Sequence, residues 1–295
     1  MSSSALRKLV LRKRLAPFLR TGQPTSFDVF GQKLSCTIHH QEHSDAPMIA
    51  ILPGWLGSAE SSYALGFAQA LWNRGYSIAR LTLRDHGGTA ALNASMFNSS
   101  LTDEVVQFVQ ASLEGAKRCG LLGFSLGGNF ALRVVRAVPE LATLAICPAS
   151  EPRDTMRRID QNFIYQRYFL TKWRETWQTK AHAFPHRYRY SDITNLNSIE
   201  TLTEHFVRAH TYFDDVASYF ASYDLSGTAL SGVNAKILAA MDDPIIPFSD
   251  FTNLPDSLDI DITQKGGHGA YLKNWRMDSW LDDYVVSHFQ QHLPI

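Results

Sequence analysis

Short apolar runs alternate with helix-spaced apolar positions along most of the chain. Buried strands are predicted at the runs PMIAILPG (47–54), YSIARLTLR (76–84), CGLLGF (119–124) and LATLAICPA (141–149). Between them, apolar residues three and four positions apart predict helices over 60–73, 103–113 and 127–137. Strands that alternate with helices form a mostly parallel sheet with helices on both faces, so the predicted fold class is α/β.

The pattern changes at two places. Near the start, SFDVF and KLSCTIHH predict a short hairpin of strands. After Pro148 no strand-length apolar run appears until about position 235, and aromatic residues are frequent instead. We interpret 151–235 as a helical cap inserted over the sheet; extra helical packing without ligand contact is the alternative. The strands AKILAAMDD and SLDIDITQKGG and a closing helix, Met277 to His292, then complete the core.

Four parts of the chain follow from this reading. They are a basic N-terminal segment (1–24), the first part of the α/β core (25–150), the helical cap insertion (151–235) and the second part of the core (236–295). A chain of 295 residues with 45% hydrophobic content can bury one large core of this kind.

The net charge and the cysteines indicate which kinds of partner and which cellular compartment to expect. The formal net charge is zero, which gives no electrostatic support for a nucleic-acid partner. The cysteines Cys36, Cys119 and Cys147 lie far apart and form no metal-ligand spacing. An odd number of cysteines suggests reduced thiols, so a cytoplasmic protein is expected. No apolar run approaches the ~20 residues of a membrane span.

The N-terminus is basic and amphipathic. Its cations have no acidic residue among them: Arg7, Lys8, Arg12, Lys13, Arg14 and Arg20. Leu6, Leu9, Val10 and Leu15 can line one face of a helix before Pro17. Two interpretations stay open here, peripheral contact with an anionic membrane surface and packing on the protein's own acidic surface.

The stretch GFSLGGNF places Ser125 between a predicted strand and a predicted helix. A nucleophilic serine at such a sharp turn has a strained backbone, and its neighbours two positions away must be small. Gly123 and Gly127 meet this need. The amide dipoles of the following helix point at the serine, where negative charge develops during acyl transfer. Ser125 is therefore the candidate nucleophile.

A serine hydroxyl needs a base, and the base needs an acid to orient it. His268 lies in QKGGHGAYL after the last predicted strand, which is where the base of this fold belongs. The acid should follow the preceding strand, where AAMDDPIIP offers Asp243 and Asp242. The acid at this position is usually followed by a proline four positions later. Pro247 stands four positions after Asp243 and therefore favours Asp243, and Asp242 is the alternative.

An oxyanion hole needs two backbone N–H groups. Leu126, which follows the nucleophile, and Trp55, in the loop LPGWLGS, are the candidates. The turn DHGGT places Asp85 beside His86 as a rival site. We favour a structural turn there, with a buried salt bridge from Arg84 or Asp85.

Five segments together resemble the α/β-hydrolase superfamily, and within it the YheT-like hydrolase/esterase family. They are GWLGSAESSYA, LRDHGGTAALN, GFSLGGNFALRV, AAMDDPIIP and GGHGAYL, and they extend from about Leu52 to Tyr271. The resemblance implies an α/β-hydrolase fold, a triad of Ser125, Asp243 and His268, and ester or thioester chemistry on acyl chains. The family commonly has a histidine where this chain has Pro53.

The predicted function is a serine hydrolase whose substrate is a small-molecule acyl ester of a carboxylic acid. In this reading Ser125 attacks the carbonyl, His268 transfers the proton and Asp243 orients the imidazole. An acyltransferase or ester synthase with the same triad is one alternative, and a non-catalytic binding protein on a hydrolase fold is another. Neither a metal nor an organic cofactor is implied, and no oligomeric state is predicted.

Overall fold

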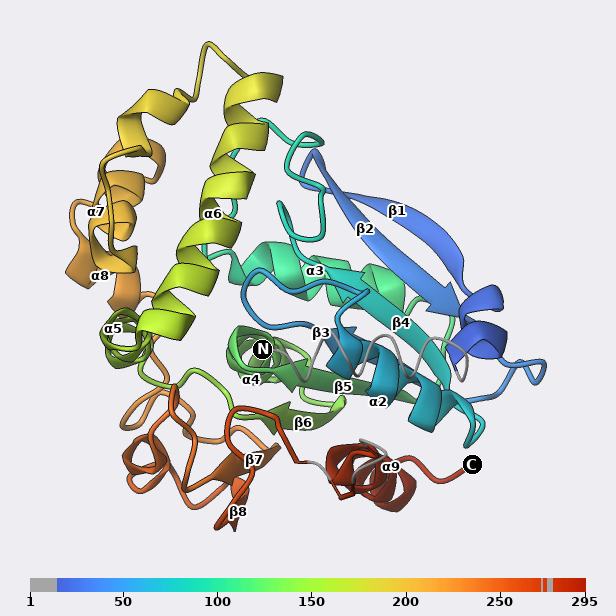
Figure 1. Ribbon diagram of the computed structural model, residues 1–295. Coiled ribbons are helices and arrows are strands. Elements are labelled where there is room, and N and C mark those ends of the chain that lie inside the picture. Colours follow the sequence, from blue (N-terminus) through green and yellow to red (C-terminus); the bar gives the residue numbers. More distant parts are fainter. Residues whose placement is uncertain (1–14, 272, 275–277) are drawn as a thin grey trace.

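A computed structural model describes residues 15–271, 273–274 and 278–295, and within them eight strands form one sheet (Figure 1). The strands are β1 Gln23–Val29, β2 Gln32–His39, β3 Met48–Leu52, β4 Ser77–Thr82, β5 Cys119–Phe124, β6 Ala142–Ile146, β7 Lys236–Ala240 and β8 Asp259–Thr263. Their order is β1-β2-β4-β3-β5-β6-β7-β8. β2 pairs antiparallel with β1 and β4, and every other pairing is parallel. The predicted mostly parallel sheet is confirmed.

The central strands are buried throughout because helices cover both faces of the sheet. All residues of β3 and β4 are buried, as expected for parallel strands without a solvent face. The register places Leu52 beside Gly123, and Phe124 beside Ile146. The carboxyl ends of β3, β5 and β6 therefore meet, and so do the loops that follow them.

Four helices cover the two faces. They are α2 Ser62–Trp72, α3 Thr102–Ser112, α4 Leu126–Ala137 and α9 Trp280–His292. Apolar side chains of α3 and α4 pack with one face of the sheet, and those of α2 and α9 pack with the other. The predicted layers are thus confirmed. The closing helix, predicted from Met277, begins at Trp280, and Met277 itself lies outside the described residues.

The segment 151–235, which we call the cap segment, lies between β6 and β7 and is helical. Its elements are α5 Pro152–Gln161, α6 Phe163–Ala183, the 3-10 turn η1 Tyr190–Ile193, α7 Ile199–His210 and α8 Val216–Ala221. A further 3-10 turn, η2 Phe248–Phe251, follows β7. Figure 1 shows α5 to α8 gathered at one end of the sheet. Their apolar side chains, Trp173 and Phe206 among them, join the core of the α3 and α4 face.

The long helix α6 is joined to the core by a buried lysine. Lys180 is fully buried, and its Nζ lies 2.7 Å from Asp85 Oδ1. The same ammonium donates to the carbonyl oxygens of Asn93 (2.6 Å) and Ser95 (3.0 Å). Three oxygen partners therefore surround this cation, and they hold α6 against the loop after β4.

The predicted basic segment is described only at its end, because residues 1–14 lie outside the described residues. Residues 15–20 are helical, and Leu15 and Phe18 are buried. The ring of Phe18 stacks on His39 with 4.1 Å between centroids. Membrane contact through the basic residues stays a prediction, which vesicle sedimentation with and without 1–14 tests. Within the described ranges, no helix combines the length and the apolar character needed to cross a membrane.

Candidate active site

Ser125 sits on the sharp turn between β5 and α4. Its backbone has φ 55° and ψ −118°, a strained conformation for a residue with a side chain. A Cβ on Gly127 would lie 2.3 Å from the Leu52 carbonyl oxygen, and one on Gly123 would lie 2.2 Å from the Gly127 oxygen. Both glycines are thus required for α4 to approach the sheet closely enough to present Ser125.

His268 and Asp243 meet Ser125 from two other loops. His268, in the loop after β8, places Nε2 3.0 Å from Ser125 Oγ and Nδ1 2.8 Å from Asp243 Oδ2. The three predicted residues thus form a continuous hydrogen-bonded chain, although they are 25 and 143 positions apart along the sequence.

Asp243 is held as an acceptor at the end of β7. Its Oδ1 accepts hydrogen bonds from the N–H groups of Ile245 (2.8 Å) and Ile246 (3.0 Å). Burial alone would raise the pKa of Asp243. The hydrogen bond and charge interaction with His268, together with the two backbone N–H groups, instead hold this pKa below its ordinary value. The carboxylate is therefore ionised and can only accept, so His268 Nδ1 carries the proton and Nε2 is free to accept from Ser125.

The neighbouring carboxylate has a different position. Asp242 Oδ1 accepts hydrogen bonds from the backbone N–H groups of Gly266 and Gly267, both at 2.8 Å. These glycines directly precede His268, so Asp242 fixes the loop that carries the imidazole. Of the two candidate acids, the structure brings Asp243 and not Asp242 to the histidine.

The two candidate oxyanion donors flank the turn at Ser125. Within the described part of the chain, no acceptor is found for the backbone N–H of Trp55 or of Leu126. Gly54 lies so close that a Cβ there would be 3.2 Å from the Ser125 Cβ. Its own N–H donates to the Tyr63 hydroxyl at 2.9 Å, which holds the loop in place.

A cavity open to solvent lies beside Ser125 and His268. The cap segment supplies much of its wall through Pro152, Thr155, Met156, Ile159, Phe169, Trp173, Thr176, Thr203, Phe206, Tyr219 and Tyr223. Trp55 contributes from the loop after β3, and its ring stacks on Phe169 with 5.1 Å between centroids. Most of this surface is apolar, so the cavity suits a hydrocarbon chain better than a charged group.

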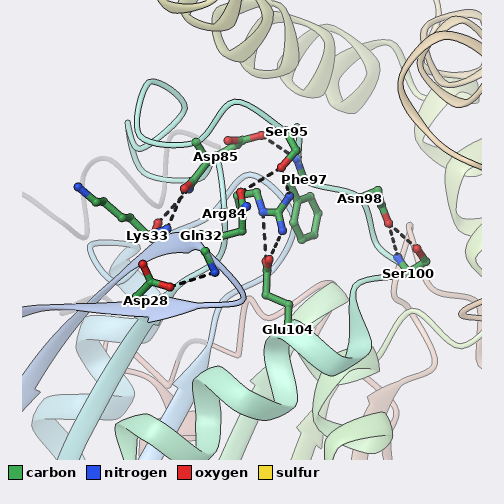
Figure 2. Close-up of polar contacts among 12 residues, drawn as sticks. Asp28, Gln32, Lys33, Arg84, Asp85, Ser95, Phe97, Asn98, Ser100 and Glu104 are labelled. Atoms are coloured by element: carbon green, nitrogen blue, oxygen red, sulfur yellow. Dashed lines mark hydrogen bonds and ion pairs between the residues drawn. The ribbon is translucent and has the colours of Figure 1, made fainter.

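The loop after β4 holds buried ion pairs and also reaches the cavity. Arg84 pairs with Glu104 of α3 and donates to Ser95 Oγ at 2.7 Å, and Asp85 accepts from the Phe97 N–H at 2.7 Å (Figure 2). The predicted buried salt bridge is confirmed, and the Asp85–Lys180 pair is a second one. Asp85 and His86 line the cavity as well, which the structural-turn interpretation did not include.

One group of side chains in the described residues has the spacing of metal ligands. Donor atoms of Cys147, Asp243 and His268 lie within 4.8 Å of one another. Burial raises the pKa of the Cys147 thiol well above its ordinary value, so the sulfur keeps its proton. Asp243 and His268 are already bonded to each other at 2.8 Å. This arrangement serves a hydrogen-bond chain better than a metal ion.

Three residues have supporting roles that the sequence analysis did not predict: Asp242, which it considered only as the alternative acid, Tyr63 and Asn129. Asn129 is fully buried on α4, and its Nδ2 donates to Ala149 and Tyr223 carbonyls, both at 2.8 Å. A signal existed for it, since an amide inside the apolar helical run GNFALRVV requires buried partners. The sequence gives no such signal for Tyr63, because its position in the predicted helix is also explained by packing in the core.

Comparison with known proteins gives a consistent result. Residues 49–282 match the model of the "Alpha/beta hydrolase family". The chain is 24% identical to "Putative esterase YheT" of Escherichia coli (strain K12) over 266 residues, which cover 81% of this chain and 77% of that protein.

Solved structures share the fold. The esterase Pf2001 of Pyrococcus furiosus has a TM-score of 0.57 at 14% identity, with 92% of each chain covered. The "Putative hydrolase" of Agrobacterium vitis S4 has a TM-score of 0.58 at 16% identity, with 92% of this chain and 99% of that chain covered. At these identities the likeness concerns the fold alone.

Proposed function

This chain belongs to the alpha/beta hydrolase family, and on that premise we propose that it is a serine hydrolase of carboxylic esters. One observation carries the proposal: Ser125 Oγ, His268 Nε2 and Nδ1, and Asp243 Oδ2 are linked at 3.0 and 2.8 Å beside an apolar cavity. A relative and a structural neighbour with esterase in their names agree with this activity.

The reaction follows from the roles that these groups can take. Ser125 Oγ attacks the ester carbonyl while its proton passes to His268 Nε2. Asp243 stabilises the imidazolium, and the N–H groups of Trp55 and Leu126 receive the oxyanion. His268 then gives the proton to the leaving alcohol, and an acyl-enzyme remains. Water, deprotonated by the same imidazole, releases the acid and restores Ser125.

The cavity indicates where the acyl chain lies. Cap-segment side chains, Met156, Ile159 and Phe206 among them, offer an apolar surface beside the nucleophile. Burial of each CH₂ contributes about 0.8 kcal/mol. We therefore expect kcat/KM to rise about fourfold per methylene until the cavity is filled.

Covalent labelling tests the proposal most directly. A fluorophosphonate should modify the protein at Ser125, and Ser125→Ala should lose both labelling and hydrolysis of 4-nitrophenyl esters with an unchanged Tm. Ser191→Ala, which alters an exposed serine of the cap segment, is the matched control and should retain both. Hydrolysis by Ser125→Ala at the wild-type rate would refute the proposal.

A further inference from the structure

The wall of the cavity beside Ser125 contains polar groups as well as apolar ones. Most polar groups of its wall have partners: the Tyr219 hydroxyl accepts from the Ser99 N–H, and the Thr203 hydroxyl donates to the Ile199 carbonyl. Two residues that line the cavity, His86 and Thr155, each carry one buried side-chain atom, Nε2 and Oγ1 respectively, with neither a hydrogen-bond nor an ion-pair partner among the described residues. A buried polar atom without a partner is costly, so a ligand is expected to supply one.

The hydrogen-bonding capacity of His86 is fixed by its surroundings. Its Nδ1 lies 2.7 Å from the Arg84 carbonyl oxygen, which can only accept, so Nδ1 carries the proton. Burial lowers the pKa of His86 to about 4, so the ring is neutral near pH 7. Nε2 therefore carries a lone pair and no proton.

The ring is also held rigidly. Phe97 packs edge-on against it with 4.7 Å between centroids, and the side chain is almost fully buried. The preceding residue, Asp85, has a φ of 65° and is fixed by Lys180 and by the Phe97 N–H. Figure 2 shows the polar contacts that Arg84 and Asp85 make in this loop. The acceptor is thus positioned before any substrate arrives.

We propose that His86 is a specificity-determining residue whose Nε2 accepts a hydrogen bond from a hydroxyl group of the ester substrate. This inference rests on the proposed ester hydrolysis and names a substrate class for it: esters that carry a hydroxyl in addition to the ester group. A neutral donor fits better than an ammonium group, because an ammonium would need a carboxylate to balance its charge. Asp85, which directly precedes His86, is already paired with Lys180. A hydroxyl can also accept, which suits a wall that holds the free hydroxyl of Thr155.

Matched pairs of esters test the inference in the full-length protein. One pair is propyl octanoate and 1-glyceryl octanoate, which differ in hydroxyls on the alcohol side. The other compares 4-nitrophenyl octanoate with its monohydroxyoctanoate analogues, except those that close a lactone. We expect at least one hydroxylated ester to exceed its plain counterpart at least about tenfold in kcat/KM, because sites built for a hydroxyl reject analogues that lack it.

Variants assign the preference to His86. His86→Phe keeps an aromatic ring but removes the acceptor, so the preference should disappear while plain esters are still hydrolysed. His86→Gln retains an acceptor and should retain part of the preference. Thr171→Val, which removes an exposed hydroxyl of α6 that lies outside the cavity and donates to the Arg167 carbonyl, is the control and should leave the preference unchanged. His86→Leu gives a second apolar replacement if the phenylalanine variant does not fold.

The outcomes separate this inference from the proposed function. Failure to hydrolyse any ester would overturn the proposed function. Hydrolysis of plain esters without preference for any hydroxylated one would overturn only the role of His86. A preference that survives both His86→Phe and His86→Leu would also overturn it, because the hydroxyl would then be recognised elsewhere.

Discussion

Replacement of Lys180 by methionine should destabilise the protein strongly, because it removes one partner of a buried ion pair. The side chain of Lys180 is 0% exposed and that of Asp85 is 2% exposed. In Lys180→Met, the Asp85 carboxylate stays buried and keeps the hydrogen bond from the Phe97 N–H. The Asn93 and Ser95 carbonyls lose their ammonium donor at the same time.

The expected loss follows from the cost of an uncompensated buried charge. Breaking a buried pair by removing one partner typically costs about 3–5 kcal/mol. For a chain of this size, such a loss lowers Tm on the order of 10 °C. Burial also raises the pKa of Asp85 to about 6 even with Lys180 present, which shows how unfavourable the site is for charge.

Denaturant unfolding followed by circular dichroism measures the effect. Lys172→Met is the matched control on the same helix: Lys172 pairs with Glu175 at 2.9 Å, but both side chains are about half exposed, so at most about 0.5 kcal/mol should be lost. The double variant Asp85→Asn/Lys180→Met removes both charges and keeps a side chain that tolerates the positive φ. It should recover about 2 kcal/mol relative to Lys180→Met. A double variant no more stable than the single one would refute the argument.

Three further predictions concern other parts of the fold. Phe18→Ala should cost about 3–5 kcal/mol in denaturant unfolding, whereas Phe30→Ala, at a side chain 69% exposed, should cost at most about 0.5 kcal/mol; equal losses would mean that the N-terminal turn is not packed as described. Gly127→Ala should abolish fluorophosphonate labelling, because its Cβ would lie 2.3 Å from the Leu52 oxygen; normal labelling would show that the turn does not need glycine there. Burial and nearby acids raise the pKa of Asp250 to about 7 against 3.8, so its ionisation destabilises the folded state as pH rises through that window. The free energy of unfolding of Asp250→Asn, relative to that of wild type, should therefore increase by about 2–3 kcal/mol from pH 5 to pH 8, at about 1.4 kcal/mol per pH unit. A difference that stays the same at both pH values would contradict this.

The candidate site was predictable because each of its members carries a local signal. Gly123 and Gly127 indicate a strained turn at Ser125, and glycines surround His268. The alternation of strands and helices then brings the carboxyl ends of the strands to one edge, where these loops meet. Sequence order and local chemistry were therefore enough to select the residues that the structure brings together.

The supporting contacts were not predictable, because they join residues whose separate positions carry no signal. Lys180 lies on a long helix with no other charged residue that is fully buried in the described structure, and its partner Asp85 is 95 positions earlier. Asp242 could be ranked against Asp243, but its hydrogen bonds to Gly266 and Gly267 depend on how two loops are packed. Such pairings are set by tertiary structure, and periodicity or composition does not encode them.

The same contacts determine how the cap segment can behave. Its two ends are fixed to the core next to the nucleophile: Asn129 donates to both the Ala149 and Tyr223 carbonyls, and the Leu225 N–H donates to the Ser150 carbonyl at 2.8 Å. Its long helix α6 is fixed a third time by Lys180. These contacts hold the cap segment against the core at three points, so we expect its side chains to form a fixed wall of the cavity; under the proposed function, that wall and the loop carrying His86 would together select the substrate.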